Sequence, residues 1–86
     1  MPTISAFYGI VIAMFFNDHD PPHFHARYAE YRARFGIATG DLLDGRLPPR
    51  ATRLVKEWTE LHRADLEEDW RLARELQPLR PIEPLP

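Results

Sequence analysis

The chain has 86 residues, a formal net charge of −2 and no cysteine, which excludes disulfide bonds and thiolate metal sites. A chain of this length forms one domain and buries only roughly 60–65% of its unfolded surface, so its core is small. The apolar run at residues 10–16 is too short to cross a bilayer, and no basic segment precedes it. We therefore expect a soluble, cytoplasmic protein that has no membrane partner.

Charge is distributed unevenly along the chain. Residues 27–56 carry seven basic and three acidic residues, whereas residues 57–76 carry three basic and seven acidic residues. We therefore expect a dipolar molecule, either side of which could meet a charged partner.

Two extended segments begin the chain. Residues 3–8 form a short extended stretch that is closed by Gly9. Residues 10–16, IVIAMFF, are apolar at both alternating sets of positions, which predicts a strand covered on both sides. The loop at 17–22, NDHDPP, ends this strand because its two prolines offer no amide donors.

A β-hairpin is predicted next. Residues 23–28 and 31–37 alternate between apolar and polar types, and only Ala29 and Glu30 lie between them as a turn. Such a turn requires a positive φ, which costs Ala29 about 1 kcal/mol relative to glycine. A second turn then leads into a short strand at 42–47.

The remainder of the domain is predicted to be helical. Pro48 and Pro49 suit a helix start, and an apolar stripe of helical period extends from Ala51 to residue 76. Asp65 with Glu68 three residues later resembles a capping box, so we expect a break near 62–64 that produces two helices. One bent helix is the alternative.

The last ten residues, QPLRPIEPLP, are rich in proline and can form neither a helix nor an inner strand. We interpret residues 77–86 as a polyproline-like tail that lies on the domain through Leu79, Ile82 and Leu85. The alternative is a ligand for an aromatic groove of another protein. The sequence thus predicts a single α+β domain over residues 1–76, with an antiparallel sheet of about four strands followed by two C-terminal helices packed on one face.

The hairpin register determines which side chains share a face of the sheet. One face is apolar, and we expect Trp58 and Trp70 of the helices to cover it. The other face carries cationic and imidazole side chains and nothing acidic, so like charges oppose one another and favour a phosphate-bearing ligand. The alternative is a solvated face on which arginine stems lie flat. The expected pairs are Tyr28 with Tyr31, Arg27 with Arg32, Ala26 with Ala33, His25 with Arg34 and Phe24 with Phe35, and the cationic face comprises His23, His25, Arg27, Arg32 and Arg34.

Three of the four histidines lie within residues 17–28. His23 and His25 are two residues apart on one strand, so both imidazoles reach the same side of the sheet. With His19 and Asp18 or Asp20 from the loop, they form a candidate set of ligands for a divalent metal such as zinc. The arginines of the cationic face argue against a metal, because they would repel a divalent cation at close range.

The same side chains also suit metal-free RNA cleavage. That reaction needs a base, an acid and cations that stabilise the phosphorane charge. Histidines titrate near neutral pH, and arginines hold phosphates. No glycine-rich phosphate loop and no serine nucleophile context accompany them. The candidate catalytic residues are His23, His25 and Arg27, and the candidate phosphate-binding or nucleic-acid-binding residues are Arg27, Arg32 and Arg34.

Three segments of the chain are typical of one protein family. They are MPTISAFYGIVIAMFFNDHDPPHFHARY, LPPRATRLVKEWTELHRADLEEDW and the closing PIEPL. Together they resemble the small bacterial family of domains of unknown function numbered 4160, and the stretch FYGI…MFFNDHDPPHFHA is specific to it. The resemblance covers nearly the whole chain. The family pattern falls here on Asp18, His19, Pro21, Pro22, His23, Phe24, His25, Trp58, His62 and Trp70.

The resemblance implies no established biochemical activity. It implies a similarity to components of type II toxin–antitoxin modules, in size and in being encoded beside another small protein that would be an antitoxin-like partner. Family members usually have glycine at the position of Ala29, and acidic or apolar residues where Arg32 and Arg34 stand. The cationic face is therefore a feature of this chain, whereas the histidines belong to the family pattern.

These patterns support three functional hypotheses. The first is a toxin-like component of a toxin–antitoxin module that acts on RNA or another phosphate-bearing target and needs no cofactor. The second is a non-catalytic binding module, whose sheet face or acidic segment at 57–76 docks a protein partner or a second copy of the chain. The third is a domain in which the histidines hold a divalent metal such as zinc.

Overall fold

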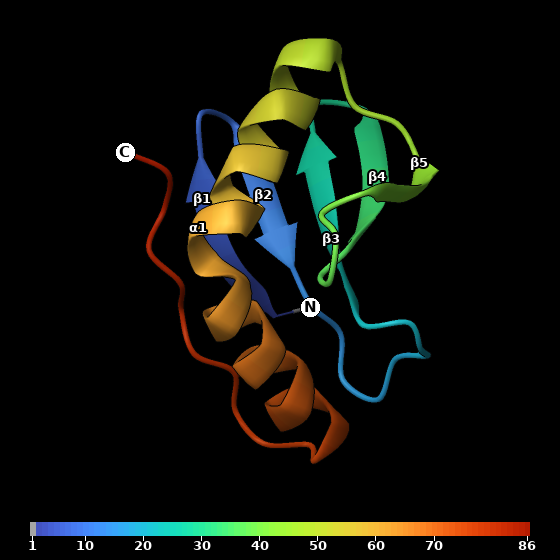
Figure 1. The fold of residues 1–86 in the computed structure, drawn as a ribbon, viewed down its shortest axis with the longest axis vertical. Coiled ribbons are helices and arrows are strands. Elements are labelled where there is room, and N and C mark those ends of the chain that lie inside the picture. Colours follow the sequence, from blue (N-terminus) through green and yellow to red (C-terminus); the bar gives the residue numbers. More distant parts are fainter. Residues whose placement is uncertain (1) are drawn as a thin grey trace.

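The structure, a computed structural model that describes residues 2–86, has a five-stranded antiparallel sheet in one layer and a single helix in the other (Figure 1). The predicted α+β fold with an N-terminal antiparallel sheet is confirmed, and the strands follow one another in chain order across the sheet. No helix among the described residues is both long and apolar enough for a bilayer crossing. The elements are β1 (Thr3–Phe7), β2 (Ile10–Ala13), β3 (His23–Tyr28), β4 (Tyr31–Gly36), β5 (Leu42–Gly45) and α1 (Pro49–Arg74).

The sheet has five strands rather than the predicted four or so. Tyr8 and Gly9 both have positive φ, 51° and 81°, and form a turn that separates β1 from β2 as a hairpin of its own. The short strand predicted at 42–47 is observed as β5, which ends at Gly45 and pairs with β4 as the fifth strand at the other edge.

The two predicted helices form one continuous helix, so that expectation is wrong. Only His62 within α1 departs from helical geometry, with φ −123° and ψ 26°. The predicted break therefore lies at the right position, but it is a kink. Trp58 before the kink and Leu66 and Trp70 after it are all buried, so the continuous helix keeps one apolar stripe against the rest of the domain.

The β3–β4 hairpin has the predicted register. All five predicted pairs are observed, from Tyr28 opposite Tyr31 at the turn to Phe24 opposite Phe35. Ala29 has a φ of 53°, the positive value that a two-residue hairpin turn requires. Alternation along these strands and a tight turn were therefore sufficient to predict which side chains lie opposite one another.

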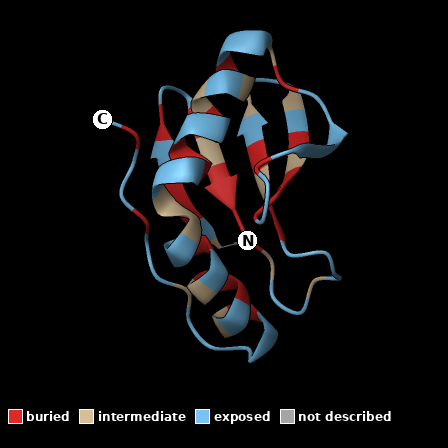
Figure 2. Cartoon of the chain, viewed as in Figure 1, coloured by how far each residue is buried: buried red, intermediate tan, exposed pale blue. Residues whose placement is uncertain are grey.

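The core lies between the sheet and α1, where Figure 2 shows the buried residues concentrated. Trp58 of α1 is fully buried, and its ring centroid lies 5.4 Å from that of Phe7 and 5.6 Å from that of Phe24. Phe24 in turn stacks on Phe35 of the neighbouring strand, with their centroids 5.7 Å apart. Trp58 thus covers the apolar face of the hairpin as predicted, whereas the ring of Trp70 packs against His23.

The proline-rich tail packs against the domain, which confirms that interpretation of its apolar residues. Ile82 and Leu85 are buried in the core, and Leu79 is partly buried against it. The Ile82 N–H donates to the Ile4 carbonyl at 2.7 Å, and the Trp58 indole N–H donates to the Glu83 carbonyl at 2.9 Å. The tail therefore runs along the helix and covers the β1 edge of the sheet (Figure 1).

Candidate functional site

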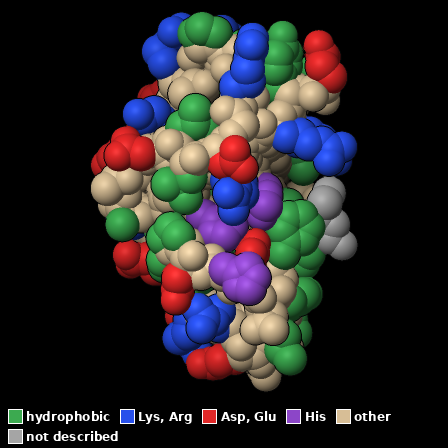
Figure 3. Space-filling model, turned by 90° about the vertical axis from the view of Figure 1, so that its right-hand side faces the viewer, with side chains coloured by type: hydrophobic (Ala, Val, Ile, Leu, Met, Phe, Trp, Pro, Cys, Tyr) green, Lys and Arg blue, Asp and Glu red, His purple; other side chains and the backbone are tan. Residues whose placement is uncertain are grey.

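Asp18 of the 17–22 loop meets two histidines of β3, and we call these three residues the histidine cluster. One ligand atom from each of Asp18, His23 and His25 lies within 4.8 Å of the other two. The Asp18 Oδ2 atom lies 3.1 Å from His23 Nε2 and 3.3 Å from His25 Nε2. Figure 3 shows histidine side chains gathered in one area of the surface with an acidic side chain among them.

His23 is buried, which contradicts the expectation that it shares an open face with His25 and the arginines. The residue is 2% exposed, whereas the side chain of His25 is 31% exposed. The His23 ring packs against Trp70 of α1, with centroids 5.4 Å apart, and its Nδ1 lies 2.8 Å from the Pro21 carbonyl oxygen. The loop and the helix together enclose the start of β3.

Electrostatics favour the ionised form of Asp18 and disfavour the protonated form of His25. Burial alone would raise the pKa of Asp18, but the His19 backbone N–H, the hydrogen bond with His25 and the nearby imidazoles together lower it below its usual value. Burial lowers the pKa of His25, and the hydrogen bond with Asp18 offsets this only in part. The cluster therefore offers a carboxylate and a nitrogen lone pair at neutral pH.

The other polar residues of this region lie outside the cluster. His19 is exposed, and its backbone N–H donates to Asp18 Oδ1 at 2.9 Å, so this residue orients the carboxylate. Asp20 forms an ion pair with Arg74 at 3.2 Å. His62, which belongs to the family pattern, is half-buried on α1, and its ring centroid lies 5.8 Å from that of Trp58.

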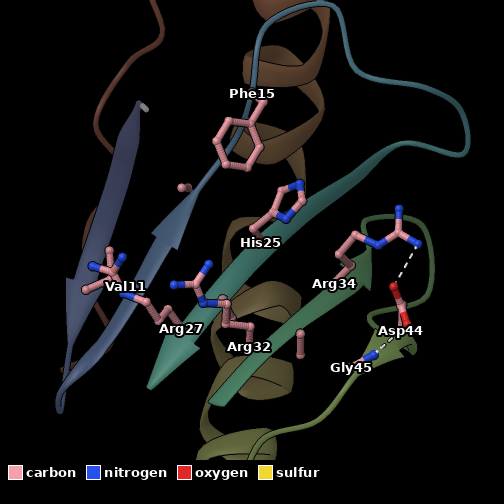
Figure 4. A pocket seen from close by; sticks show the side chains of 11 residues that line it. Val11, Phe15, His25, Arg27, Arg32, Arg34, Asp44 and Gly45 are labelled. Carbon is pink, nitrogen blue, oxygen red and sulfur yellow. Dashed lines mark hydrogen bonds and ion pairs between the residues drawn. The ribbon is translucent and has the colours of Figure 1, made fainter. Parts of the chain in front are cut away.

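A groove of about 340 Å³ lies beside the cluster, on the sheet face that α1 does not cover, which we call the open face. Figure 4 shows Arg27 and Arg32 close to one another in this groove, with His25 and Phe15 farther along it. His25 belongs both to the groove and to the histidine cluster. The labelled residues that line the groove are Val11, Phe15, His25, Arg27, Arg32, Arg34, Asp44 and Gly45.

Arg27 and Arg32 carry the unbalanced charge of the groove. They lie directly opposite one another on β3 and β4, and no carboxylate among residues 2–86 forms an ion pair with either. Arg34 differs, because Asp44 of β5 binds it at 3.1 Å. The prediction that nothing acidic lies on this face is therefore wrong at Arg34 and right at the Arg27–Arg32 pair.

The sequence did not point to the apolar wall of the groove. The strand at 10–16 was predicted to be covered on both sides, but Val11 and Phe15 are only half-buried and line the open face. Val11 lies opposite Arg27 in the β2–β3 register. Alternation along β2 places Val11 and Phe15 on the opposite face from buried Ile10 and Ile12. Which of the two faces meets the helix depends on the register of β2 with β3, and the sequence did not reveal that register.

Comparisons with known proteins identify the family of the chain. A family model described as "Domain of unknown function (DUF4160)" matches residues 9–71, which include β2 to β5, the histidine cluster and most of α1. No curated protein and no solved structure matches the chain significantly. Because the family model matches more than half of the chain, the protein belongs to the DUF4160 family.

Proposed function

We propose that this member of the DUF4160 family binds RNA in the groove of its open face and acts as a toxin-like component of a type II toxin–antitoxin module. The observation that carries the proposal is the Arg27–Arg32 pair, which faces the groove without a carboxylate partner among residues 2–86. Like charges directly opposite one another destabilise a sheet. A phosphate placed between the two guanidinium groups would remove that repulsion and accept charge-assisted hydrogen bonds.

The wall of the groove favours a nucleotide over a free phosphate. Phe15 is half-buried at the groove, and its ring centroid lies 4.4 Å from that of His25 in an edge-on arrangement. Proteins that bind single-stranded nucleic acid combine a cationic groove with aromatic rings on which bases stack. Phe15 supplies such a ring beside Arg27 and Arg32 (Figure 4).

The proposal assigns contact with RNA to His25 and Arg27 and does not assign proton transfer to His23. A general acid or base must come within hydrogen-bond reach of the reacting group, and buried His23 faces Asp18 and Trp70 instead. A metal-free mechanism with two histidines therefore lacks its second exposed imidazole. Binding is the function that the groove supports best.

RNA binding is tested by fluorescence anisotropy with a labelled, short single-stranded oligoribonucleotide. We expect the Arg27→Ala/Arg32→Ala variant to bind at least about tenfold more weakly. The slope of log K against log salt concentration should become shallower by about 1.4, because two phosphate contacts to a single strand are lost. The matched control is Arg50→Ala/Arg53→Ala, which removes the same charge from exposed positions of α1. Equal losses in both variants, or no binding by the wild type, would contradict a specific groove.

The toxin-like role is tested separately in cells. Induced expression of the wild type alone should slow growth, and expression of His25→Ala or of the double arginine variant at the same level should not. Co-expression of the small protein encoded alongside, the antitoxin-like partner, should restore growth. Normal growth with the wild type alone would remove the toxin assignment and leave RNA binding to be judged by the anisotropy measurement.

A second candidate function, docking of a protein partner, is favoured by the edge strand β5. All four residues of β5 are exposed, and Leu42 and Leu43 remain 44% and 45% exposed there. An exposed edge with apolar side chains accepts a strand from another chain. Replacing Leu43 by lysine should reduce co-purification of the antitoxin-like protein, and unchanged recovery would count against this surface.

A further inference from the structure

The histidine cluster contains one buried nitrogen that the protein itself does not satisfy, beside a carboxylate that, within residues 2–86, hydrogen-bonds only to His25 Nε2 and to the His19 backbone. His23 Nδ1 lies 2.8 Å from the Pro21 carbonyl oxygen, which can only accept a hydrogen bond, so the ring proton resides on Nδ1. In the neutral form of this ring, the lone pair is therefore on Nε2. That atom is buried and has no hydrogen-bond partner, although it faces Asp18 Oδ2 at 3.1 Å.

Two acceptors at this distance repel one another unless a cation lies between them. The carboxylate form of Asp18 has two oxygens that only accept hydrogen bonds. A buried acceptor without a partner costs free energy, so the arrangement requires either a proton on His23 Nε2 or a bound ion. The third member, His25 Nε2, approaches the same carboxylate oxygen at 3.3 Å.

Two of the three separations match those of ligands around one small ion, and the two histidine nitrogens lie within 4.8 Å of one another. Zinc binds histidine nitrogen at roughly 2.0–2.1 Å and carboxylate oxygen at roughly 2.0–2.2 Å, so two ligands of a tetrahedral ion lie about 3.3 Å apart. The two observed contacts of Asp18 Oδ2 are 3.1 Å and 3.3 Å. Two imidazoles and one carboxylate also form the ligand set of open, three-residue metal sites.

The surroundings hold the three ligands in place. The Pro21 carbonyl sets the tautomer of His23, and the His19 backbone N–H holds the second oxygen of Asp18. Such hydrogen bonds to the far side of a ligand are typical of metal centres. The loop is fixed at its ends, because the Asn17 N–H donates to the Ala73 carbonyl and the Pro22 carbonyl accepts from Ile37.

The nearby arginines weigh less against a cation than the sequence suggested. Arg34 is the arginine whose charge acts on His25, and Asp44 neutralises it at 3.1 Å. Access is also provided, because the side chain of Asp18 is 22% exposed and that of His25 is 31% exposed. These two ligand side chains can therefore be reached by an ion from solvent.

We infer that Asp18, His23 and His25 bind one divalent transition-metal ion of the zinc class. The three ligands come from the loop and from alternate residues of β3, so the ion joins the start of the strand to the loop that precedes it. The inference goes beyond RNA binding and does not depend on it. Its test uses the metal and the protein alone.

The experiment is a cobalt(II) and zinc titration of tag-free protein from which metals have been removed by a chelator. We expect saturable binding of one equivalent, visible cobalt absorption bands that zinc abolishes, and a melting temperature that rises with zinc. His25→Ala and Asp18→Asn should weaken binding at least about tenfold. The Asp18→Asn side chain keeps the shape of aspartate, so it remains informative if the histidine variant fails to fold.

The matched control is His19→Ala, which removes an exposed histidine of the same loop outside the cluster. Wild-type affinity in this control would support the assignment. An equal loss in the control, or the absence of one-equivalent binding, would overturn it. A His23 ring doubly protonated at neutral pH by NMR, in protein that binds no zinc, would show that a proton occupies the place of the ion and would also overturn it.

Discussion

The two faces of the sheet differ in what their side chains do, although these side chains alternate along the same strands. On the packed face Phe24 and Phe35 are 0% exposed and contact one another beneath the helix. On the open face Arg27 and Arg32 are exposed and face the groove. Alternate residues of β3 and β4 therefore form part of the core on one face and present positive charge to the groove on the other. Substitutions on the two faces should separate these properties.

The largest effect is expected on the packed face at Trp58. Trp58→Ala should lower the free energy of unfolding by about 3–5 kcal/mol, because it removes a fully buried ring that packs on Phe7 and Phe24. It also removes the indole N–H that binds the Glu83 carbonyl of the tail. Urea denaturation followed by circular dichroism measures the change.

The control for this prediction lies on the open face. Arg27→Ala/Arg32→Ala should change the free energy of unfolding by less than about 0.5 kcal/mol, because surface substitutions have small effects and repulsion between the two arginines is relieved. A destabilisation of this double variant comparable with that of Trp58→Ala would mean that the open face also contributes to the core, and the division between the faces would be wrong.

The second largest loss of stability is expected at Gly45, which belongs to the edge strand β5 and lines the groove. Gly45 has a φ of 76°, and an added Cβ would overlap the Arg32 backbone carbonyl. Gly45→Ala should therefore destabilise the protein by about 1–3 kcal/mol and weaken RNA binding by displacing Arg32. Gly36→Ala is the matched control, because its added Cβ would lie 3.6 Å from the Leu43 side chain, an ordinary contact. Thermal melts of both variants that shift equally would contradict this reasoning.

These contrasts show which parts of the molecule were predictable from sequence. The register from Phe24–Phe35 to Tyr28–Tyr31 was predictable because a two-residue turn and alternating side chains are local features. The partner of Arg34 was not, since Asp44 reaches it through the β4–β5 pairing, which contains an irregularity between Arg34 and Phe35. Local patterns predict elements and faces, whereas contacts between non-adjacent segments depend on packing.

The histidines illustrate the same limit at the candidate site. Spacing on a strand correctly brought His23 and His25 together, because alternate residues share a side of the sheet. It could not predict that Trp70, far along the chain, covers His23. The kink at His62 was predicted as a helix end for a similar reason: the local capping pattern of Asp65 is present, but burial of Leu66 beyond it sustains the helix.

A third prediction concerns Asp69, an ionisable residue that is buried on the packed side of the sheet. Asp69 is 1% exposed; its Oδ1 accepts from the Arg80 backbone N–H at 2.9 Å, and its Oδ2 has no partner. Burial raises its pKa above 3.8, and the nearby charges of Asp65 and Glu68 add to this effect. The folded state thus holds the proton more tightly than the unfolded state, so this stabilisation is present in acid and is lost as pH rises through the raised pKa.

Asp69→Asn should remove that pH dependence. The amide keeps an acceptor for Arg80 and carries no buried charge, so the variant should match the wild type in acid and exceed its stability by about 1 kcal/mol at neutral pH. Thermal melts across the acid-to-neutral range measure the difference between the two proteins. A difference that is constant across this range would show that Asp69 does not titrate with a raised pKa.

The smallest effect is expected at the hairpin turn that joins the two faces. Ala29 has a φ of 53°, a conformation that glycine adopts without the steric cost of a Cβ. Ala29→Gly should therefore raise the free energy of unfolding by up to about 1 kcal/mol, the gain being reduced by the greater entropy of glycine in the unfolded chain. Glu30→Gly is the control, because Glu30 has no positive φ and should gain nothing. RNA affinity should be the same in both variants, since neither residue lines the groove, and a change in affinity would show that the turn also positions Arg27 and Arg32.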